Sequence, residues 1–307
     1  MAKKITFLAI AALFVAVLAM PHNAGALTLK PTSREVLLTP GEKTVTSVDL
    51  ENETQKEIKL TTQVVNFTAK NETGEPAFDF TATPTDIATW TSPESGPFTL
   101  TPGQKQSVLV TFNTPATATP GGHYVAVFFN EVPSTDTSKV NIESKLGALF
   151  LATVKGTYVS SGEVANFTTL NNKAYFDKGP ISFVLRYNNT GDVHLKPTGS
   201  LVIKNMWGKT VKTITVNTEL GATLPNTIRE YSVGGWNNVG NGYGQYTATL
   251  TLKSGTVENT KTIHFWFFSG MSMIIFIVVA IILILLAVML LKRSHGAPSV
   301  PPVAPKK

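Results

Sequence analysis

Few residues of this chain could carry out chemistry, and they do not form a catalytic pattern. The central part of the sequence has three histidines, His123, His194 and His264, and none stands in a metal-ligand spacing with another. Cysteine is absent, so no thiolate can act as a nucleophile or as a metal ligand. Neither a Gly-x-Ser-x-Gly turn nor a phosphate-binding loop occurs. The sequence therefore predicts no enzymatic activity, no cofactor and no metal site.

One loop carries the side chains best suited to contact a ligand. Residues 234–246 contain Trp236, Tyr243 and Tyr246 among glycines and asparagines. Exposed aromatic rings on a polar loop give a large contact area for little loss of conformational entropy, and flat rings stack on sugar faces. We therefore predict that Trp236, Tyr243 and Tyr246 contact a ligand. The alternative is that Trp236 and Tyr246 face the core and that the glycines form a wide turn.

The N-terminus has the features of a secretory signal peptide. A pair of lysines precedes an uncharged apolar segment, residues 5–20, and small residues follow at 24–26. These features predict a signal peptide over residues 1–26, with the mature chain beginning near Leu27. A retained N-terminal membrane helix is the alternative.

The C-terminus carries a membrane-spanning pattern. Residues 265–291 contain no Asp, Glu, Lys or Arg, and the stretch exceeds the roughly 20 apolar residues that cross a bilayer as a helix. Lys292 and Arg293 follow directly, which predicts a cytoplasmic tail over residues 292–307 and an N-terminus outside the cell. Trp266 occupies the position of an interfacial aromatic anchor. We therefore predict a single-pass type I protein of the cell membrane with an extracellular ectodomain; a buried core helix is the alternative.

The net charge of +6 comes from the two ends of the chain. Six of the 26 basic residues lie in the predicted signal peptide and tail, and the remaining 20 balance the 20 acidic residues. The ectodomain is therefore neutral, and we predict no nucleic-acid partner. Its first half, residues 27–135, has a net charge of −5, and its second half, residues 136–264, a net charge of +5. A basic second half would be attracted weakly to anionic lipid or wall polymers, and ordinary scatter of surface charge is the alternative.

The ectodomain sequence is typical of β-structure throughout. Short alternating runs rich in Val, Thr, Ile and Phe are separated by turn residues at intervals of about 8–12 positions, as in β-sandwiches. We predict an all-β ectodomain of two tandem Ig-like β-sandwiches, domain 1 over residues 27–135 and domain 2 over residues 136–264. Residues 133–139 have the composition of a linker. Residues 146–153 are predicted as the first strand of domain 2, or as a strand packed between the domains.

The absence of cysteine also bears on the compartment. Secreted eukaryotic sandwiches usually carry disulfides, so a disulfide-free secreted β-protein indicates a bacterial cell surface. The sequence contains Asn-x-Ser/Thr sequons, which chance explains in a chain rich in Asn and Thr. The sequons begin at Asn52, Asn66, Asn71, Asn166 and Asn188.

Several motifs of the ectodomain resemble a known family. They are LTPGEK with VDLEN (38–52), LTPGQKQSVLVTFNTP with GGHYVAVFF (100–129), TLPNTIREYSV (223–233) and GYGQYTATLTLKSG (242–255). Together with the signal peptide and the terminal helix, they resemble the bacterial WxL-interacting surface proteins, which contain the domain of unknown function 916 (DUF916). The turn-and-strand pattern of domain 1 also resembles the Ig-like N-terminal module of pilus chaperones. The family resemblance implies that domain 1 contacts peptidoglycan and that domain 2 contacts a host or partner protein.

These observations favour a non-enzymatic binding function. We expect an adhesion or scaffold protein of the bacterial cell surface that binds cell-wall glycan, a surface protein or both. An alternative is a membrane-tethered assembly factor that resembles a pilus chaperone and accepts a partner by β-strand addition at an exposed edge strand. An enzyme on a sandwich scaffold would instead need a concave pocket with convergent acidic or histidine residues.

Overall fold

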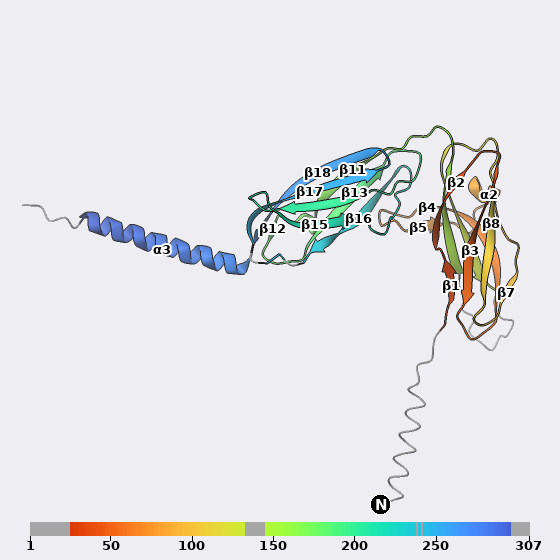
Figure 1. The fold of residues 1–307 in the computed structure, drawn as a ribbon, viewed down its shortest axis with the longest axis horizontal. Coiled ribbons are helices and arrows are strands. Elements are labelled where there is room, and N and C mark those ends of the chain that lie inside the picture. The colour runs from red at the N-terminus through yellow and green to blue at the C-terminus, as the bar shows by residue number, and fades with distance from the viewer. Residues whose placement is uncertain (1–24, 133–144, 238, 241, 296–307) are drawn as a thin grey trace, which may run out of the picture. The chain divides into compact units, whose positions relative to one another are not determined.

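A computed structural model describes most of the chain (Figure 1), namely residues 25–132, 145–237, 239–240 and 242–295. The predicted signal peptide up to residue 24, the predicted linker and the tail from residue 296 lie outside the described residues. The described chain is built mainly from strands and has a long helix at its C-terminal end. It divides into two compact units. The first contains residues up to 68 and 77–157, and the second contains residues 69–76 and 158 onwards.

The first unit is a β-sandwich of two sheets. The smaller sheet has its described strands in the order β1 (Leu27–Lys30), β3 (Lys43–Asn52), β8 (Lys105–Asn113) and β6 (Thr91–Pro93). The larger sheet has the order β2 (Ser33–Leu38), β10 (Lys145–Val154), β9 (Gly121–Glu131), β4 (Ile58–Ala69) and β5 (Pro76–Phe78), with β7 (Phe98–Leu100) also paired to β4. β2 pairs with β10 in parallel. A short helix, α2 (Ile87–Trp90), lies between β5 and β6.

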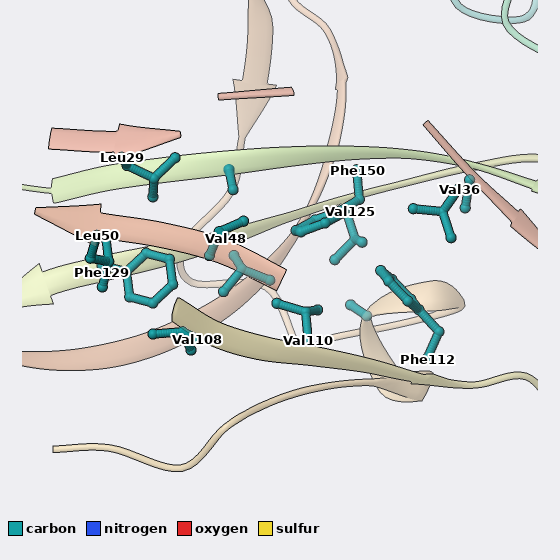
Figure 2. Packing of buried hydrophobic residues seen from close by; sticks show 14 of the residues in the cluster. Leu29, Val36, Val48, Leu50, Val108, Val110, Phe112, Val125, Phe129 and Phe150 are labelled. Carbon is teal, nitrogen blue, oxygen red and sulfur yellow. The ribbon is translucent and has the colours of Figure 1, made fainter. Parts of the chain in front are cut away.

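The core of the first unit follows from the two-residue alternation of its strands. Alternate side chains of β3, β8, β9 and β10 meet between the sheets (Figure 2), among them Val48, Leu50, Val108, Val110, Val125, Phe129 and Phe150. The rings of Phe112 and Phe150 come from opposite sheets and meet edge to face, with centroids 5.4 Å apart. The alternating pattern of residues 107–112 therefore identifies the inward face of β8 correctly.

The predicted boundary between the two domains differs from the structure. Residues 145–154 form β10, which lies between β2 and β9 in the larger sheet of the first unit. The first unit therefore extends to Thr157 and not to residue 135. The physical reason is that β10 occupies an inner position of this sheet and buries alternate side chains, including Ala148 and Phe150, in the first core. The expectation that this strand opens the second sandwich is corrected accordingly.

The second unit is also a β-sandwich. Its smaller sheet has the described strands β11 (Gly162–Thr169), β13 (Ile181–Asn189) and β16 (Thr227–Trp236), in that order. Its larger sheet has the order β12 (Tyr175–Phe176), β18 (Val257–Phe268), β17 (Tyr243–Ser254), β14 (Thr198–Lys204) and β15 (Thr210–Val216). A 3₁₀ turn, η1 (Leu170–Asn172), precedes β12. Alternate residues of β17 from Tyr246 to Leu252 are buried, as their pattern predicts.

A buried asparagine ends a strand in each unit. Asn52 is the last residue of β3, and its Nδ2 donates to the carbonyl oxygen four residues later at 2.7 Å and to that of Leu100 at 2.9 Å. Asn189 is the last residue of β13, and its Nδ2 donates to the carbonyl oxygen four residues later at 2.8 Å and to that of Thr223 at 2.9 Å. In both cases Oδ1 accepts from the backbone N–H two residues later. Each fully buried amide thus provides hydrogen-bond partners for backbone groups at the end of its strand.

The described chain ends in a long apolar helix, α3 (Gly270–His295), drawn in blue in Figure 1. Residues 272–292 form a candidate membrane span, and all of its side chains except that of Ser272 are exposed. A helix that is apolar on all sides needs an apolar surrounding. The alternative of a buried core helix is therefore excluded, and the length and composition of the span fit a bilayer.

Candidate binding edge and the predicted ligand loop

The structure separates the three aromatic residues of the predicted ligand loop. Trp236 ends β16 and Tyr246 lies in β17, and they are only 5% and 4% exposed in the core of the second unit. Their rings lie 5.3 Å apart, and Tyr246 stacks on Phe265 with centroids 5.7 Å apart. Burial raises the pKa of the Tyr246 phenol, which therefore stays neutral in the core. The prediction that Trp236 and Tyr246 contact a ligand is wrong, because both strands turn these side chains inward.

Tyr243 lies in a different environment. It begins β17, and 37% of its surface is exposed. Its ring meets that of Trp207 edge to face at 5.6 Å and that of Phe276 in α3 at the same distance. Of the three predicted residues, Tyr243 alone can reach a partner outside the protein, and its role as a ligand contact stays a prediction.

The larger sheet of the first unit contains a strand whose two sides are covered unequally. On one side, β10 pairs along its whole length with β9. On the other side, β2 pairs only with residues 149–154. Among the described residues, no strand pairs with this side of residues 145–148. These four residues, the open edge of β10, form the candidate binding site.

The gap results from the path of the N-terminal segment. β1 pairs with β3 in the smaller sheet, and the chain then crosses at Pro31 and Thr32 to join the larger sheet as β2. Proline lacks a backbone N–H and cannot donate to a sheet ladder, so Pro31 suits a crossing point. Beside β10, the Leu149 N–H donates to the Thr32 carbonyl oxygen at 2.9 Å. β2 therefore begins too late to cover residues 145–148.

Backbone geometry identifies the groups that the open edge offers. Leu149 directs its N–H toward β2, and residues two apart in a strand direct their backbone groups to the same side. The N–H and C=O groups of Lys145 and Gly147 therefore face the open side, whereas those of Leu146 and Ala148 face β9. A partner strand would find a donor and an acceptor on each of the two outward-facing residues.

The side chains beside the open edge are apolar on the inner face of the sheet. Ala148 is buried, and Leu146 and Leu27 are half-buried and pack against the core of the first unit. An apolar side chain of a partner strand would remove the remaining surface of Leu146 from water, which stabilises by about 25 cal/mol per Å². On the outer face, a Cβ at Gly147 would lie 2.7 Å from the ring of Phe128, so glycine is the residue that fits.

Several other described edges are less suited to accept a strand. β5 and β6 have three residues each and contain Pro76 and Pro93, respectively. β12 has two residues. β2 and β15 carry the charged residues Arg34 and Lys212. Short strands, prolines and charges are the features that discourage edge-to-edge pairing. The open edge is short and carries one charge, Lys145, whereas residues 146–148 contain neither a charge nor a proline.

Two histidines of the described chain, His123 and His264, take part in local contacts. No group of three or more His, Asp or Glu residues in that part of the protein could hold a metal ion. His123 is 6% exposed, and its two ring nitrogens are engaged with Asp86 and the Thr119 carbonyl oxygen. His264 contacts the Thr247 hydroxyl at 3.1 Å on the surface of the second unit.

No protein-family model matches the chain, and no curated protein matches it. Solved structures are similar to it at low identity. A chain of the chaperone-tip adhesin complex of CFA/I fimbriae biogenesis is 12% identical, with a TM-score of 0.40, over 80% of this chain and 100% of that chain. The class 5 fimbriae chaperone CfaA is 12% identical, with a TM-score of 0.38, over 78% and 98%. The E. coli chaperone DraB is 13% identical, with a TM-score of 0.37, over 79% and 97%.

Proposed function

We propose that this chain is a non-enzymatic, single-pass membrane protein of the bacterial cell surface that binds a protein partner by β-strand addition at the open edge of β10. The observation that carries the proposal is the unequal cover of β10, which is paired with β9 throughout but with β2 only over residues 149–154. An extended segment of the partner would pair with residues 145–148, where β1 lies close to β10 without pairing with it. Backbone hydrogen bonds would give affinity, and inward side chains of the partner would give specificity.

The C-terminal helix supports the membrane part of the proposal. Its apolar span, residues 272–292, is long enough to cross a bilayer and is not buried inside the protein. The positive residues Lys292 and Arg293 end the span, which favours a cytoplasmic C-terminus and an extracellular pair of sandwiches. Anchoring in this way holds the open edge at the cell surface, where secreted and wall-attached proteins are available as partners.

The size of the open edge limits the strength of the interaction. Lys145 and Gly147 offer their backbone groups to a partner, and each hydrogen bond made there contributes about 0.5–1.5 kcal/mol. Ordering the partner segment opposes this gain. We therefore expect a reversible contact or one part of a larger interface, which favours a scaffold or assembly role over permanent adhesion.

Binding of peptidoglycan is the competing function, and it is the one that the resemblance to WxL-interacting proteins implies for the first domain. Sugar chains have no peptide backbone and therefore cannot pair with a sheet edge as a strand does. Glycan binding would therefore be insensitive to changes in the backbone of residues 145–148, whereas strand addition would depend on them.

Site-directed cross-linking tests the proposal, and the absence of cysteine gives it a clean background. Lys145→Cys places one thiol at the open edge, and Leu37→Cys places one on an exposed side chain of β2, away from it. Each full-chain variant is labelled with benzophenone maleimide in the native membrane and irradiated. We expect a discrete protein adduct from Lys145→Cys and none of that size from Leu37→Cys.

A proline variant separates backbone pairing from mere proximity. Lys145→Pro removes an N–H that faces the open side and leaves the ladder with β9 intact, and Leu37→Pro does the same on the outer side of β2. We expect Lys145→Pro, but not Leu37→Pro, to abolish co-purification of the partner that cross-linking identifies. Thermal unfolding should show that both variants are folded. Retention of the partner by Lys145→Pro would contradict strand addition. If equal shares of both variants then sedimented with isolated peptidoglycan, glycan binding would be favoured.

A further inference from the structure

The second unit carries wholly or partly exposed aromatic side chains at the end from which α3 begins. They are Tyr175 of β12, Trp207 of the turn between β14 and β15, Tyr243 of β17, and Trp266 and Phe268 of β18. Tyr175 and Trp207 are each 65% exposed, and Tyr243 and Trp266 are each 37% exposed. We propose that these five residues, the aromatic collar, lie in the headgroup region of the membrane and hold the second sandwich against the bilayer.

Strand pairing places the collar on one face of the larger sheet. The residues on either side of Trp266 are 1% exposed in the core, so Trp266 and Phe268 point to the opposite face. Tyr175 pairs with Trp266 and Tyr243 pairs with Phe268, and directly paired residues share a face. The rings of Trp266 and Phe268 stack with centroids 5.7 Å apart. Trp207 extends the row, since its ring meets that of Tyr243 at 5.6 Å.

Contacts with α3 set the depth of the collar relative to the span. The ring of Tyr243 lies 5.6 Å from that of Phe276 in α3. The Ser269 N–H donates to the Gly242 carbonyl oxygen at 3.3 Å, which holds the start of α3 beside the start of β17. The apolar span begins at Ser272, and Phe276 lies four residues, or about 6 Å, further along the helix axis. Tyr243 and its neighbours therefore lie at the level where the hydrocarbon begins.

The chemistry of the collar fits a lipid headgroup region. Trp and Tyr concentrate at membrane interfaces, because the ring is apolar and the N–H or O–H group forms hydrogen bonds. The adjacent segments 173–178 and 204–209 contain four lysines and one aspartate, and lysines near a bilayer attract anionic headgroups. Since the collar is continuous with the membrane span, lipid is the partner that covers it. The collar depends on anchoring by α3, which is part of the proposed function, but not on strand addition in the first unit.

Quenching of tryptophan fluorescence by brominated lipid tests the collar. The full chain is reconstituted into phosphatidylcholine vesicles whose acyl chains carry bromine close to the headgroup. Variants replace one of the four tryptophans at a time with phenylalanine. We expect Trp207→Phe and Trp266→Phe each to remove part of the quenched emission. Trp90→Phe, in the first unit, is the matched control and should leave the quenched emission unchanged.

The same vesicles distinguish failure of the collar from failure of the anchor. An alkaline carbonate wash shows whether α3 retains the chain. If the chain is retained and Trp207→Phe leaves the quenched emission unchanged, the collar is overturned and the anchor stands. If the chain is washed off, the anchor and the collar both fall. Aqueous acrylamide gives a second measurement. In vesicles, Trp207 should be less accessible to acrylamide than a tryptophan in a short peptide that is free in solution. Full access of acrylamide to Trp207 would also overturn the collar.

Discussion

His123 and Asp86 form a partly buried ion pair in the first unit. Nδ1 of the imidazole lies 2.6 Å from Oδ2 of Asp86, and Nε2 lies 2.8 Å from the carbonyl oxygen of Thr119. Both partners accept hydrogen bonds, so both ring nitrogens donate, which only the imidazolium form can do. Asp86 has a φ of 46°, in the left-handed region, and directly precedes α2. The pair therefore holds a strained residue at the point where the segment between β5 and β6 enters the core.

This pair predicts a maximum of stability in mildly acidic solution. Burial opposes the charged form of His123, but the hydrogen bonds to Asp86 and Thr119 outweigh it and raise the pKa of His123. Burial also opposes ionised Asp86, and the bond from His123 outweighs it and lowers the pKa of Asp86. The histidine contribution is complete below about pH 6.5 and is lost as pH rises through the raised pKa. The aspartate contribution is complete above about pH 4 and is lost as pH falls through the lowered pKa.

Asp86→Asn tests this dependence. Because the Asp86 side chain is 45% exposed, we expect the free energy of unfolding at pH 5.5 to fall by only about 1 kcal/mol, with a flatter profile between about pH 6 and 8. Thermal unfolding of the full chain in detergent, followed across pH, gives the comparison. Asp79→Asn, an exposed carboxylate of the same segment, is the control. If the free energy of unfolding of Asp86→Asn changed with pH as it does in the parent, the ion pair would not contribute to the pH dependence.

The buried asparagines should tolerate substitution poorly. Asn52→Leu would leave the carbonyl oxygens of Lys56 and Leu100 and the N–H of Thr54 without their partner. Unsatisfied buried groups cost about 1–3 kcal/mol each, and partial access to water reduces the total, so we expect a loss of about 2–4 kcal/mol. Urea unfolding measures it. Asn71→Leu, in an exposed turn, is the control, and an equal effect of the two substitutions would contradict the role of Asn52.

Substitution of Tyr246 and of Tyr243 tests which residues of the predicted ligand loop belong to the core. Tyr246→Ala removes a buried ring and should lower the free energy of unfolding by about 3–5 kcal/mol, as for other buried aromatic side chains. Tyr243→Ala removes a partly exposed ring and should cost about 1 kcal/mol or less. Denaturant unfolding of both variants gives the values. A small effect of Tyr246→Ala would restore its place among candidate ligand contacts.

Local patterns in the sequence predict the faces of strands and the turns that begin them. The alternation of Val108 and Val110 identifies the inward face of β8, and both residues are fully buried. The Pro-Gly pairs in the motifs LTPGEK (38–43) and LTPGQK (100–105) suit turns with a positive φ at the glycine, and Gly41 and Gly103 have φ values of 79° and 76°. Both features depend on neighbours within a few residues, which is why sequence alone is sufficient.

Features that depend on distant partners could not be predicted in the same way. Alternation tells which side of β10 faces a core, but it does not tell which strands pair with β10. The pairing with β9 covers the whole strand, whereas β2, more than a hundred residues earlier, pairs only with residues 149–154. The open edge follows from the pairing with β2, so alternation does not predict it either. In the sequence, Asn52 is recognisable only as the start of a sequon. Its structural role is not apparent there, because the carbonyl oxygen of Leu100 that accepts its hydrogen bond is 48 residues away. The glycines around Trp236 and Tyr246 favour a loop, although β16 and β17 extend to both residues.

The membrane span can be tested by a charge at its centre. Ile282 lies midway along residues 272–292, and Ile282→Lys should raise the free energy of insertion by about 2.5–3.5 kcal/mol. Met273→Lys is the control, because a lysine at the end of the span can extend to the interface. We expect alkaline carbonate to release a larger share of Ile282→Lys than of Met273→Lys. Equal retention of both variants would mean that the centre of α3 does not lie in hydrocarbon, and the proposed anchor would then have to be abandoned.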